Sequence, residues 1–233
     1  MNGPNSLKRR AVCVCSGGLD STVSAAIAKE EGYDLYFLHL NYGHRAQEKE
    51  IEATGNIARY LNAEDIKFQE LNFLKELGSS SLTDFSIDVP TGDSVKFGNV
   101  TPSTWVPCRN LVFLSLASSY AEANGAEAIF VGFNAEEAES YPDNTSSFVD
   151  KFNTVLTESV ASFSEPPQIK APLVDMYKKD IVRKAIEVNA PFSLTWSCYL
   201  DYEKQCGECE ACQHRKRGFK EAKIKDPTDY MTD

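Results

Sequence analysis

The sequence has no apolar run of membrane-spanning length and no excess of positive charge. Its longest apolar runs, such as residues 111–116, are far shorter than the ~20 residues that a membrane-spanning helix needs. The 24 Lys and Arg residues are outnumbered by 34 Asp and Glu residues, which gives a net charge of −10. Nonspecific binding of nucleic acid needs a basic face, so this charge argues against DNA or RNA as a partner. No apolar stretch of signal-peptide length follows the basic N-terminus, so we expect a cytoplasmic protein without a membrane partner.

The sequence also lacks internal repeats, low-complexity tracts and an even set of cysteines. Four of its seven Cys residues lie within fifteen residues, a spacing that favours reduced thiols and a metal site over a disulfide framework. The length of 233 residues and the hydrophobic content of 42% suit one large domain with a small appendage. We predict a loose arm over residues 1–10, a nucleotide-binding domain over 11–190, and a zinc-binding region over 191–233 packed on that domain.

Short apolar runs alternate with amphipathic helical patterns. Strands are predicted over residues 11–15, 35–40, 66–71, 128–133 and 169–172, and helices over residues 20–31, 48–61, 110–124, 148–163 and 177–188. Long loops are predicted over 78–108 and 135–146. This alternation predicts a Rossmann-like, doubly wound α/β fold with a parallel sheet covered on both faces. Because such sheets bind ligands at the carboxyl ends of their strands, the loops after the first, second and fourth strands are the candidate sites.

The first of these loops carries a motif that suits phosphate. It is neither a Walker A motif, which needs Gly-Lys-Ser/Thr, nor a G-x-G-x-x-G dinucleotide fingerprint. Glycines let the backbone approach a ligand, hydroxyls can donate hydrogen bonds, and the following helix start offers unpaired N–H groups. The motif therefore predicts a pyrophosphate cradle, and the alternative is an ordinary strand-to-helix turn capped by Asp20 or Ser21. Its residues are Ser16, Gly17, Gly18, Leu19, Asp20, Ser21 and Thr22.

The second motif is a cluster of cysteines near the C-terminus. Cys198, Cys206, Cys209 and Cys212 have the spacing C-x7-C-x2-C-x2-C, which can surround one Zn²⁺ tetrahedrally. A site closed by four sulfurs is structural and does not activate water. An iron–sulfur cluster is the second choice, and His214 is an alternative ligand to one of the cysteines.

The two motifs together resemble a known family. The string 16–22 resembles the pyrophosphate loop (PP-loop) of the N-type ATP pyrophosphatases, whose fold is that of the adenine nucleotide α-hydrolases. With the four-Cys knuckle, it resembles the QueC family of the queuosine and archaeosine pathways. The strings that agree further cover residues 38–45, 106–110, 132–135, 141–143, 194–199 and 226–230. The similarity therefore extends over nearly the whole chain.

The resemblance implies an ATP-dependent C–N ligase. Its substrate would be the deazapurine acid 7-carboxy-7-deazaguanine, adenylated on its carboxylate. Ammonia would displace AMP to give an amide, and a second adenylation would allow elimination to the nitrile, 7-cyano-7-deazaguanine. The implied cofactors are structural Zn²⁺ and the Mg²⁺ that accompanies ATP, and the implied assembly is a homodimer.

The resemblance also implies roles for residues. Asp20, Arg109 and Lys178 are the expected catalytic residues, with Lys179 as the alternative to Lys178. The ATP site would comprise Cys15, the loop 16–22 and Arg45. Asp143 would accept hydrogen bonds from the amino and ring N–H groups of the substrate, and Tyr141 or Phe133 would stack on its plane. The expected substrate residues are Asn110, Phe133, Asn134, Tyr141 and Asp143.

The sequence departs from the family pattern at several positions. His44 stands where the family usually has Gln, and Ser140, Asn144 and Thr145 stand where it has Gly, Cys and Arg. A lost Arg favours an acceptor larger than ammonia, so an alternative is a ligase that joins the acid to another amine, such as a protein amine. Two further alternatives are a tRNA-modifying ATP pyrophosphatase and a non-enzymatic zinc-knuckle module. The last rests on a basic patch of Arg215, Lys216, Arg217 and Lys220.

Overall fold

A computed structural model describes residues 9–97 and 101–232 and has the predicted parallel sheet. The sheet has five strands in the order β3-β2-β1-β4-β5, all parallel. The fourth strand ends three residues earlier than predicted, and the other strand boundaries shift by one or two residues. The strands are β1 (Arg10–Val14), β2 (Asp34–Asn41), β3 (Asp65–Glu70), β4 (Ala128–Phe130) and β5 (Gln168–Lys170).

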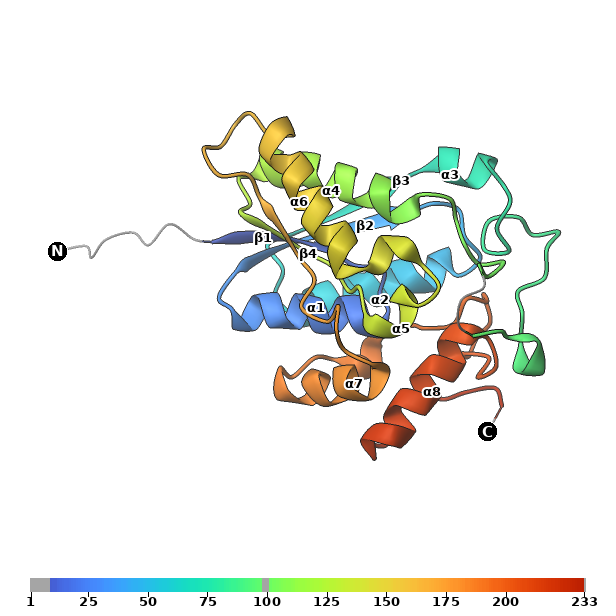
Figure 1. Cartoon of the computed structure of the whole chain (residues 1–233). Helices are drawn as coiled ribbons and strands as arrows, with labels where there is room; N and C mark the ends of the chain where they lie inside the picture. The colour runs from blue at the N-terminus through green and yellow to red at the C-terminus, as the bar shows by residue number, and fades with distance from the viewer. Residues whose placement is uncertain (1–8, 98–100, 233) are drawn as a thin grey trace.

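Helices cover both faces of the sheet, as predicted (Figure 1). One face is covered by α1 (Leu19–Glu30), α2 (Gln47–Tyr60) and α7 (Lys178–Glu187), and the other by α4 (Arg109–Asn124) and α6 (Ser146–Ser159). In β1, Ala11 and Cys13 point into the first core while Val12 points into the second. This alternation follows from the two-residue period of a strand. It explains why the central strands are apolar throughout.

Several short elements and one long helix were absent from the sequence prediction. Helix α3 (Asn72–Glu76) follows β3, and the predicted loop 135–146 contains α5 (Ala135–Ala138) and a 3₁₀ turn. Helix α8 (Glu210–Ala222) occupies the cysteine-rich region, for which no helix was predicted. Its sequence is rich in Ala, Glu, Lys and Arg, which are good helix formers, so the local signal was present and the prediction missed it. Among the described residues, no helix is long and apolar enough to cross a membrane.

The predicted N-terminal arm, residues 1–10, overlaps the start of the sheet. Residues 1–8 lie outside the described residues. Arg10 is the first residue of β1, and the Arg9 guanidinium pairs with Glu127 at 2.6 Å. The sheet therefore begins one residue earlier than the sequence indicated.

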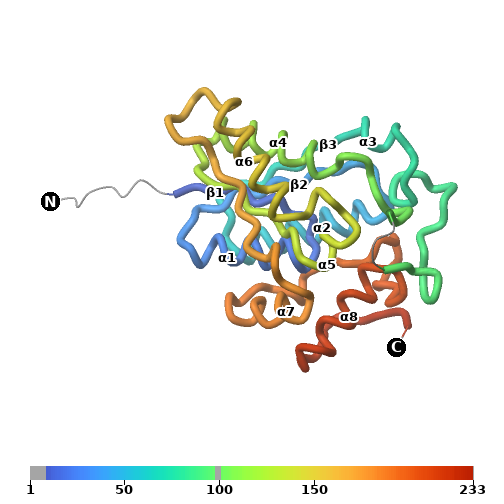
Figure 2. Tube along the Cα trace, viewed as in Figure 1, coloured from blue at the N-terminus to red at the C-terminus, as the bar shows by residue number. Residues whose placement is uncertain are grey.

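The C-terminal region packs on the rest of the chain by placing α8 against α7. The guanidinium of Arg215 is buried and donates two hydrogen bonds of 3.1 Å to Asp226 and one of 3.0 Å to the Phe192 carbonyl. Gly218 allows the two helices to approach closely, since a Cβ at this position would lie only 2.7 Å from Lys178 Cβ. Figure 2 shows the chain after α3 descending beside the start of α8, where the Gly92 N–H donates to the Glu208 carbonyl at 3.0 Å.

Gly132, directly after β4, is a place where added volume is expected to destabilise the fold. A Cβ at this position would lie 2.5 Å from Ser21 N and 2.7 Å from the Asp20 carbonyl carbon, which are backbone atoms that cannot swing aside. We expect Gly132→Ala to lower the free energy of unfolding by about 1–3 kcal/mol in urea titrations. The matched control is Gly55→Ala in α2, where no atom lies within 4 Å. That variant should be as stable as the wild type or slightly more stable; equal destabilisation of both would contradict the expectation.

Candidate active site

The predicted phosphate loop connects β1 to α1 at the carboxyl end of the sheet. Gly17 has φ +78°, and a Cβ there would lie 2.8 Å from the Glu50 carbonyl oxygen, so only glycine fits. The Thr22 hydroxyl donates to the Gly18 carbonyl at 2.7 Å, and the Ser16 hydroxyl accepts from the Gly18 N–H at 3.3 Å. These hydrogen bonds fix the turn that leads into α1. They therefore also fix the first N–H groups of α1, which have no acceptor within the helix.

An ion pair between Asp20 and Lys178 lies beside this turn. One carboxylate oxygen of Asp20, Oδ2, accepts from Lys178 Nζ and, at 3.4 Å, from Asn134 Nδ2. The other oxygen, Oδ1, is buried and has no hydrogen-bond partner among the described residues. An unpaired buried oxygen is costly, so Oδ1 suits a cation or a donor that arrives with a ligand.

Lys178 is fixed by several acidic groups. Its backbone N–H donates to Glu136 at 3.0 Å, and its Nζ lies 3.5 Å from Glu137 Oε1. Burial opposes the charge on Lys178, but the carboxylates of Asp20 and Glu137 outweigh it and raise the pKa of the ammonium above its ordinary 10.5. Lys178 is therefore a permanently charged cation beside the phosphate loop.

The loop and the ion pair lie where two cavities meet. The inner lobe, about 200 Å³, runs beneath the strand ends and is lined by apolar groups and by Arg109. The outer lobe, about 520 Å³, lies between the phosphate loop and α8 and is lined by many charged residues. The residues common to both lobes are Ser16, Gly18, Asp20, Glu50, Glu137 and Tyr199.

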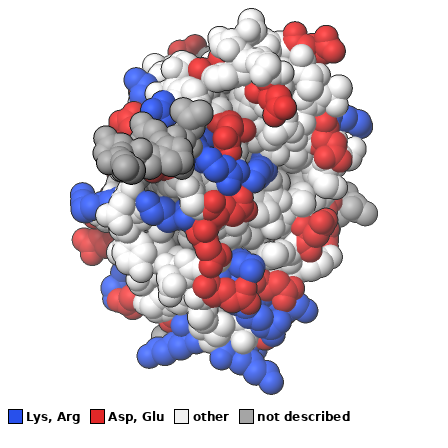
Figure 3. Space-filling view, turned by 90° about the vertical axis from the view of Figure 1, so that its left-hand side faces the viewer, with Lys and Arg blue, Asp and Glu red and all other residues white. Residues whose placement is uncertain are grey.

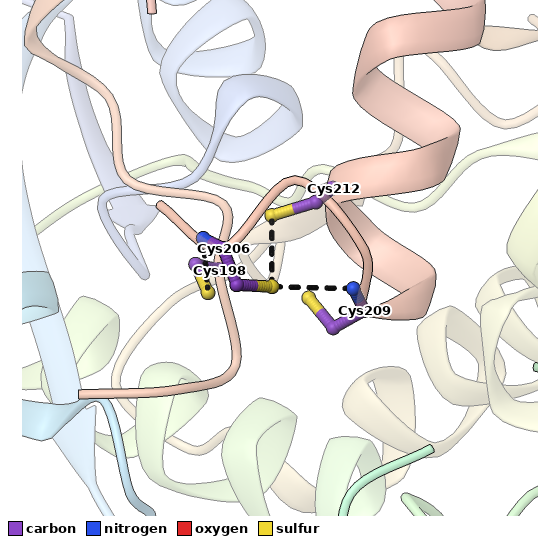
Figure 4. Close-up of side chains that lie close together, drawn as sticks. All are labelled: Cys198, Cys206, Cys209 and Cys212. Atoms are coloured by element: carbon purple, nitrogen blue, oxygen red, sulfur yellow. Dashed lines mark hydrogen bonds between the residues drawn. The ribbon is translucent and has the colours of Figure 1, made fainter. Parts of the chain in front are cut away.

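The four cysteines of the second motif converge as the spacing predicts (Figure 4). Their sulfur atoms all lie within 4.8 Å of one another and are buried. Tetrahedral zinc with Zn–S bonds of ~2.3 Å requires sulfurs ~3.8 Å apart, so the cluster fits one such ion. Cys206 Sγ accepts from the N–H of Cys209 at 3.2 Å, a bond that favours thiolate. The alternative ligand His214 instead lies 2.5 Å from Glu136 Oε2.

Comparison with known proteins shows to which family this chain belongs. A profile described as "Queuosine biosynthesis protein QueC" matches residues 10–223, which is most of the chain. The chain belongs to the QueC family. The 7-cyano-7-deazaguanine synthase of Methanothrix thermoacetophila is 54% identical over 223 residues, covering 95% of this chain and 99% of that protein. The 7-cyano-7-deazaguanine synthase of a Sulfurovum species is 44% identical over 222 residues, covering 95% of this chain and 98% of that protein.

Solved structures resemble this QueC chain only distantly. An NH3-dependent NAD synthetase from Campylobacter jejuni matches with a TM-score of 0.47 and 16% identity, over 82% of this chain and 68% of that one. A 4-thiouridine synthetase crystallised with RNA and ATP matches with a TM-score of 0.46 and 20% identity, over 78% of this chain and 41% of that one. Similarity at this level supports no conclusion about function.

The structure brings most of the predicted QueC site residues to the two lobes. Two of the catalytic candidates, Asp20 and Lys178, are in contact, and this contact distinguishes Lys178 from Lys179, which also lines the outer lobe. Leu19 and Tyr141 line the outer lobe. The predicted residues that line the inner lobe are Cys15, Ser21, Arg109, Asn110 and Phe133.

Other predicted residues lie behind the cavity walls. Gly17 and Thr22 shape the loop from beneath, and neither lines a lobe. Asn134 is buried; its side chain accepts from the Glu137 N–H at 3.1 Å and donates to Asp20, so it positions the carboxylate. Asp143 accepts from the Asn110 N–H at 3.2 Å and lines only a side cavity of about 30 Å³. These residues thus contact the residues that line the lobes and do not line the lobes themselves.

Arg45 is not brought to the phosphate loop. Its guanidinium donates to the carbonyls of Ser81 and Ile87, at 2.9 Å each, and lies 4.7 Å from the centre of the Phe85 ring. It lines neither lobe. In this structure Arg45 fixes the long loop that begins at residue 78, and its predicted contact with ATP has no geometric support.

The altered acceptor loop also differs from its expected placement. Thr145 is the N-cap of α6: its hydroxyl accepts from the Phe148 N–H at 3.1 Å. It lines neither lobe, whereas Asn144 lines the inner lobe and Ser140 the outer one. Thr145 itself therefore does not border either lobe.

Several cavity residues were missed by sequence reasoning. Glu50 lines both lobes and lies 3.1 Å from His44 Nε2. Burial favours the neutral form of Glu50, but His44 outweighs it and holds the pKa of that carboxyl below its ordinary 4.5. The backbone N–H of Trp196 donates to the Gly17 carbonyl at 2.9 Å, which joins the C-terminal region to the phosphate loop. No local motif marks these residues, because helix packing alone assembles them.

Proposed function

We propose that the protein uses ATP to adenylate the carboxylate of 7-carboxy-7-deazaguanine and converts it with ammonia into 7-cyano-7-deazaguanine. The observation that carries this proposal is the Asp20–Lys178 pair beside the phosphate loop, at the junction of the two lobes. The proposal is supported by QueC family membership and by relatives of that name at 54% and 44% identity. It makes the protein an ATP-dependent enzyme.

The two lobes suit the two substrates. The inner lobe offers an apolar surface at the carboxyl ends of the strands, which suits adenosine. Its apolar lining residues include Val14, Leu40, Phe113, Leu114, Val131 and Phe133. More charged residues line the outer lobe than the inner one, which suits the deazaguanine acid. The phosphates of ATP then lie between them, against the start of α1 and Lys178.

The chemistry follows from this arrangement. A carboxylate oxygen of the acid attacks the α-phosphorus, and the bond from that phosphorus to pyrophosphate breaks. Ammonia then attacks the acyl carbon, one proton leaves the nitrogen, and AMP leaves with the former carboxylate oxygen. In the second cycle the amide oxygen is adenylated, AMP departs with it, and the nitrogen loses its protons to leave the nitrile. Lys178 neutralises charge on the separating pyrophosphate, and the lobes align the reacting groups.

Two metal ions belong to the proposal. The unpaired Oδ1 of Asp20 fits the Mg²⁺ that accompanies ATP, an ion that supplies neutralisation of phosphate charge. The four buried sulfurs fit Zn²⁺, which would be held by Cys198, Cys206, Cys209 and Cys212. With four sulfur ligands the zinc would have no open position, so it would stabilise α8 and take no part in the reaction.

The alternatives have less support. Figure 3 shows acidic and basic side chains interspersed over one face, with no broad basic surface of the kind that tRNA binding needs. Thr145, the position that suggested an amine larger than ammonia, caps α6 and is not part of the wall of either lobe.

The proposal is tested by product analysis with the wild-type protein. AMP and pyrophosphate should form from ATP only when 7-carboxy-7-deazaguanine is present, and with ammonia as the sole amine the product mass should be that of the nitrile. Accumulation of the amide alone would replace the synthase proposal with an amide-forming ligase. Absence of AMP with this acid would overturn the proposal.

A further inference from the structure

The outer lobe is lined by seven carboxylates, and these differ in whether a cationic side chain lies beside them. These residues are Asp20, Glu50, Glu136, Glu137, Glu139, Glu210 and Glu221. Glu139 and Glu221 are exposed to solvent, which hydrates their charge. A buried or half-buried carboxylate instead needs a cation or several donors close to it.

Most of the less exposed carboxylates have a cationic partner. Asp20 and Glu137 face Lys178. Glu136 accepts from Arg217 at 2.7 Å and lies 2.5 Å from His214.

Glu50 lies 3.1 Å from His44. The charges of Lys178 and Arg217 are therefore already paired with Asp20, Glu137 and Glu136.

Glu210 is the exception among the described residues of this wall. It is half-buried, and no Lys, Arg or His nitrogen of the described chain forms an ion pair with it. Its Oε2 accepts only two long bonds of 3.4 Å, from the hydroxyls of Tyr141 and Thr104. The carboxylate therefore has free acceptor capacity in the cavity, held in place by neutral donors.

An aromatic surface lies beside this carboxylate. Tyr141 lines the outer lobe and stacks on Trp105, with ring centres 5.8 Å apart and planes 23° from parallel. The Tyr141 hydroxyl also lies 2.8 Å from Thr104 Oγ1, which fixes the ring. A planar heterocycle in the outer lobe can contact this ring while its edge faces Glu210.

The position of Glu210 is set by the cysteine cluster. It is the first residue of α8, directly after Cys209, and the Glu208 carbonyl accepts the Gly92 N–H. Asp143, which the sequence suggested as the acceptor for the substrate edge, is occupied by the Asn110 N–H and faces only the side cavity. Glu210 thus gives the outer lobe an acceptor that has no cationic partner among the described residues and that lies beside the ring of Tyr141.

We infer that Glu210 is the specificity-determining residue that accepts hydrogen bonds from the ring N–H and the 2-amino group of a guanine-like substrate. The inference rests on the proposed function and names the group that reads the heterocycle. A carboxylate with two oxygens matches two adjacent N–H donors, and this pairing is stronger than one between neutral groups. A ring without the 2-amino group would make only one of the two bonds.

The test is calorimetric binding to the zinc-loaded protein without ATP, so it needs no turnover. The ligands are 7-carboxy-7-deazaguanine and its analogue that lacks the 2-amino group. Wild-type protein should bind the first at least about 10-fold more tightly. Glu210→Gln should weaken binding of the first by about 10- to 100-fold and remove most of the preference, while the affinity for ATP and the zinc content stay unchanged.

The matched control is Glu158→Gln, which removes an exposed carboxylate from α6 that lines neither lobe and should leave both affinities unchanged. Glu210→Asp keeps the charge and should retain part of the preference. An unchanged preference in Glu210→Gln would overturn the inference even if the wild type makes the nitrile. Failure of the wild type to bind either acid would overturn the inference, whereas binding without AMP formation would overturn only the proposed function.

Discussion

Replacing Asp20 by Asn is expected to reduce pyrophosphate release by at least about 100-fold. The substitution keeps the shape of the side chain and removes the negative charge that holds Lys178 and that faces the phosphate loop through the unpaired Oδ1. The measurement is release of AMP and pyrophosphate with saturating acid and ATP. Near-normal turnover would show that the phosphate-loop interpretation is wrong.

The same substitution should also affect stability, because Asp20 is not a simple surface residue. Its partner Lys178 is buried and would keep only Glu137, at 3.5 Å. Breaking a buried ion pair on one side costs about 3 kcal/mol, so we expect a loss of this order in urea unfolding.

Two further variants separate catalysis from stability. Asp180→Asn removes a charge from an exposed pair with Arg183 and should change neither activity nor stability measurably. The double variant Asp20→Asn with Lys178→Met removes the unpaired charge, so it should recover stability but not activity. Recovery of activity in the double variant would contradict the role given to both residues.

Removal of the metal is expected to have an even larger effect on stability. We expect one zinc per chain by elemental analysis, bound at the four-Cys cluster. Structural zinc in small domains contributes an apparent ~10–16 kcal/mol of binding free energy near neutral pH, and part of this free energy stabilises the fold. Chelation, or Cys212→Ser, should therefore lower the melting temperature strongly and abolish turnover.

The loss of turnover has a structural reason. Cys209 immediately precedes α8, which forms one wall of the outer lobe, and Trp196, two residues before Cys198, binds the Gly17 carbonyl of the phosphate loop. Cys108→Ser is the control, because this cysteine is exposed and lies outside the cluster. It should keep its zinc and its stability. Iron in place of zinc, or a chelated protein of unchanged stability, would contradict the prediction.

The sequence predicted those features that local chemistry or periodicity encodes. Apolar runs alternating with helical patterns gave the parallel sheet, because each strand buries both of its faces. The glycines and hydroxyls of residues 16–22 identified the phosphate loop, since Gly17 must adopt a positive φ against α2. The spacing of four cysteines likewise predicted a cluster whose sulfurs do converge.

The tertiary structure decided which charged side chains meet, because contacts between distant elements leave no local pattern. Lys178 and Lys179 are equivalent in sequence, and only the packing of α7 against α1 and α8 places Lys178 on Asp20. Arg45 resembled a phosphate ligand, but the carbonyls of a loop some forty residues away bind its guanidinium. Glu210 carries no signal beyond its place between two cysteines; the balance of charge around the outer lobe, which exists only in the folded chain, leaves it without a cation.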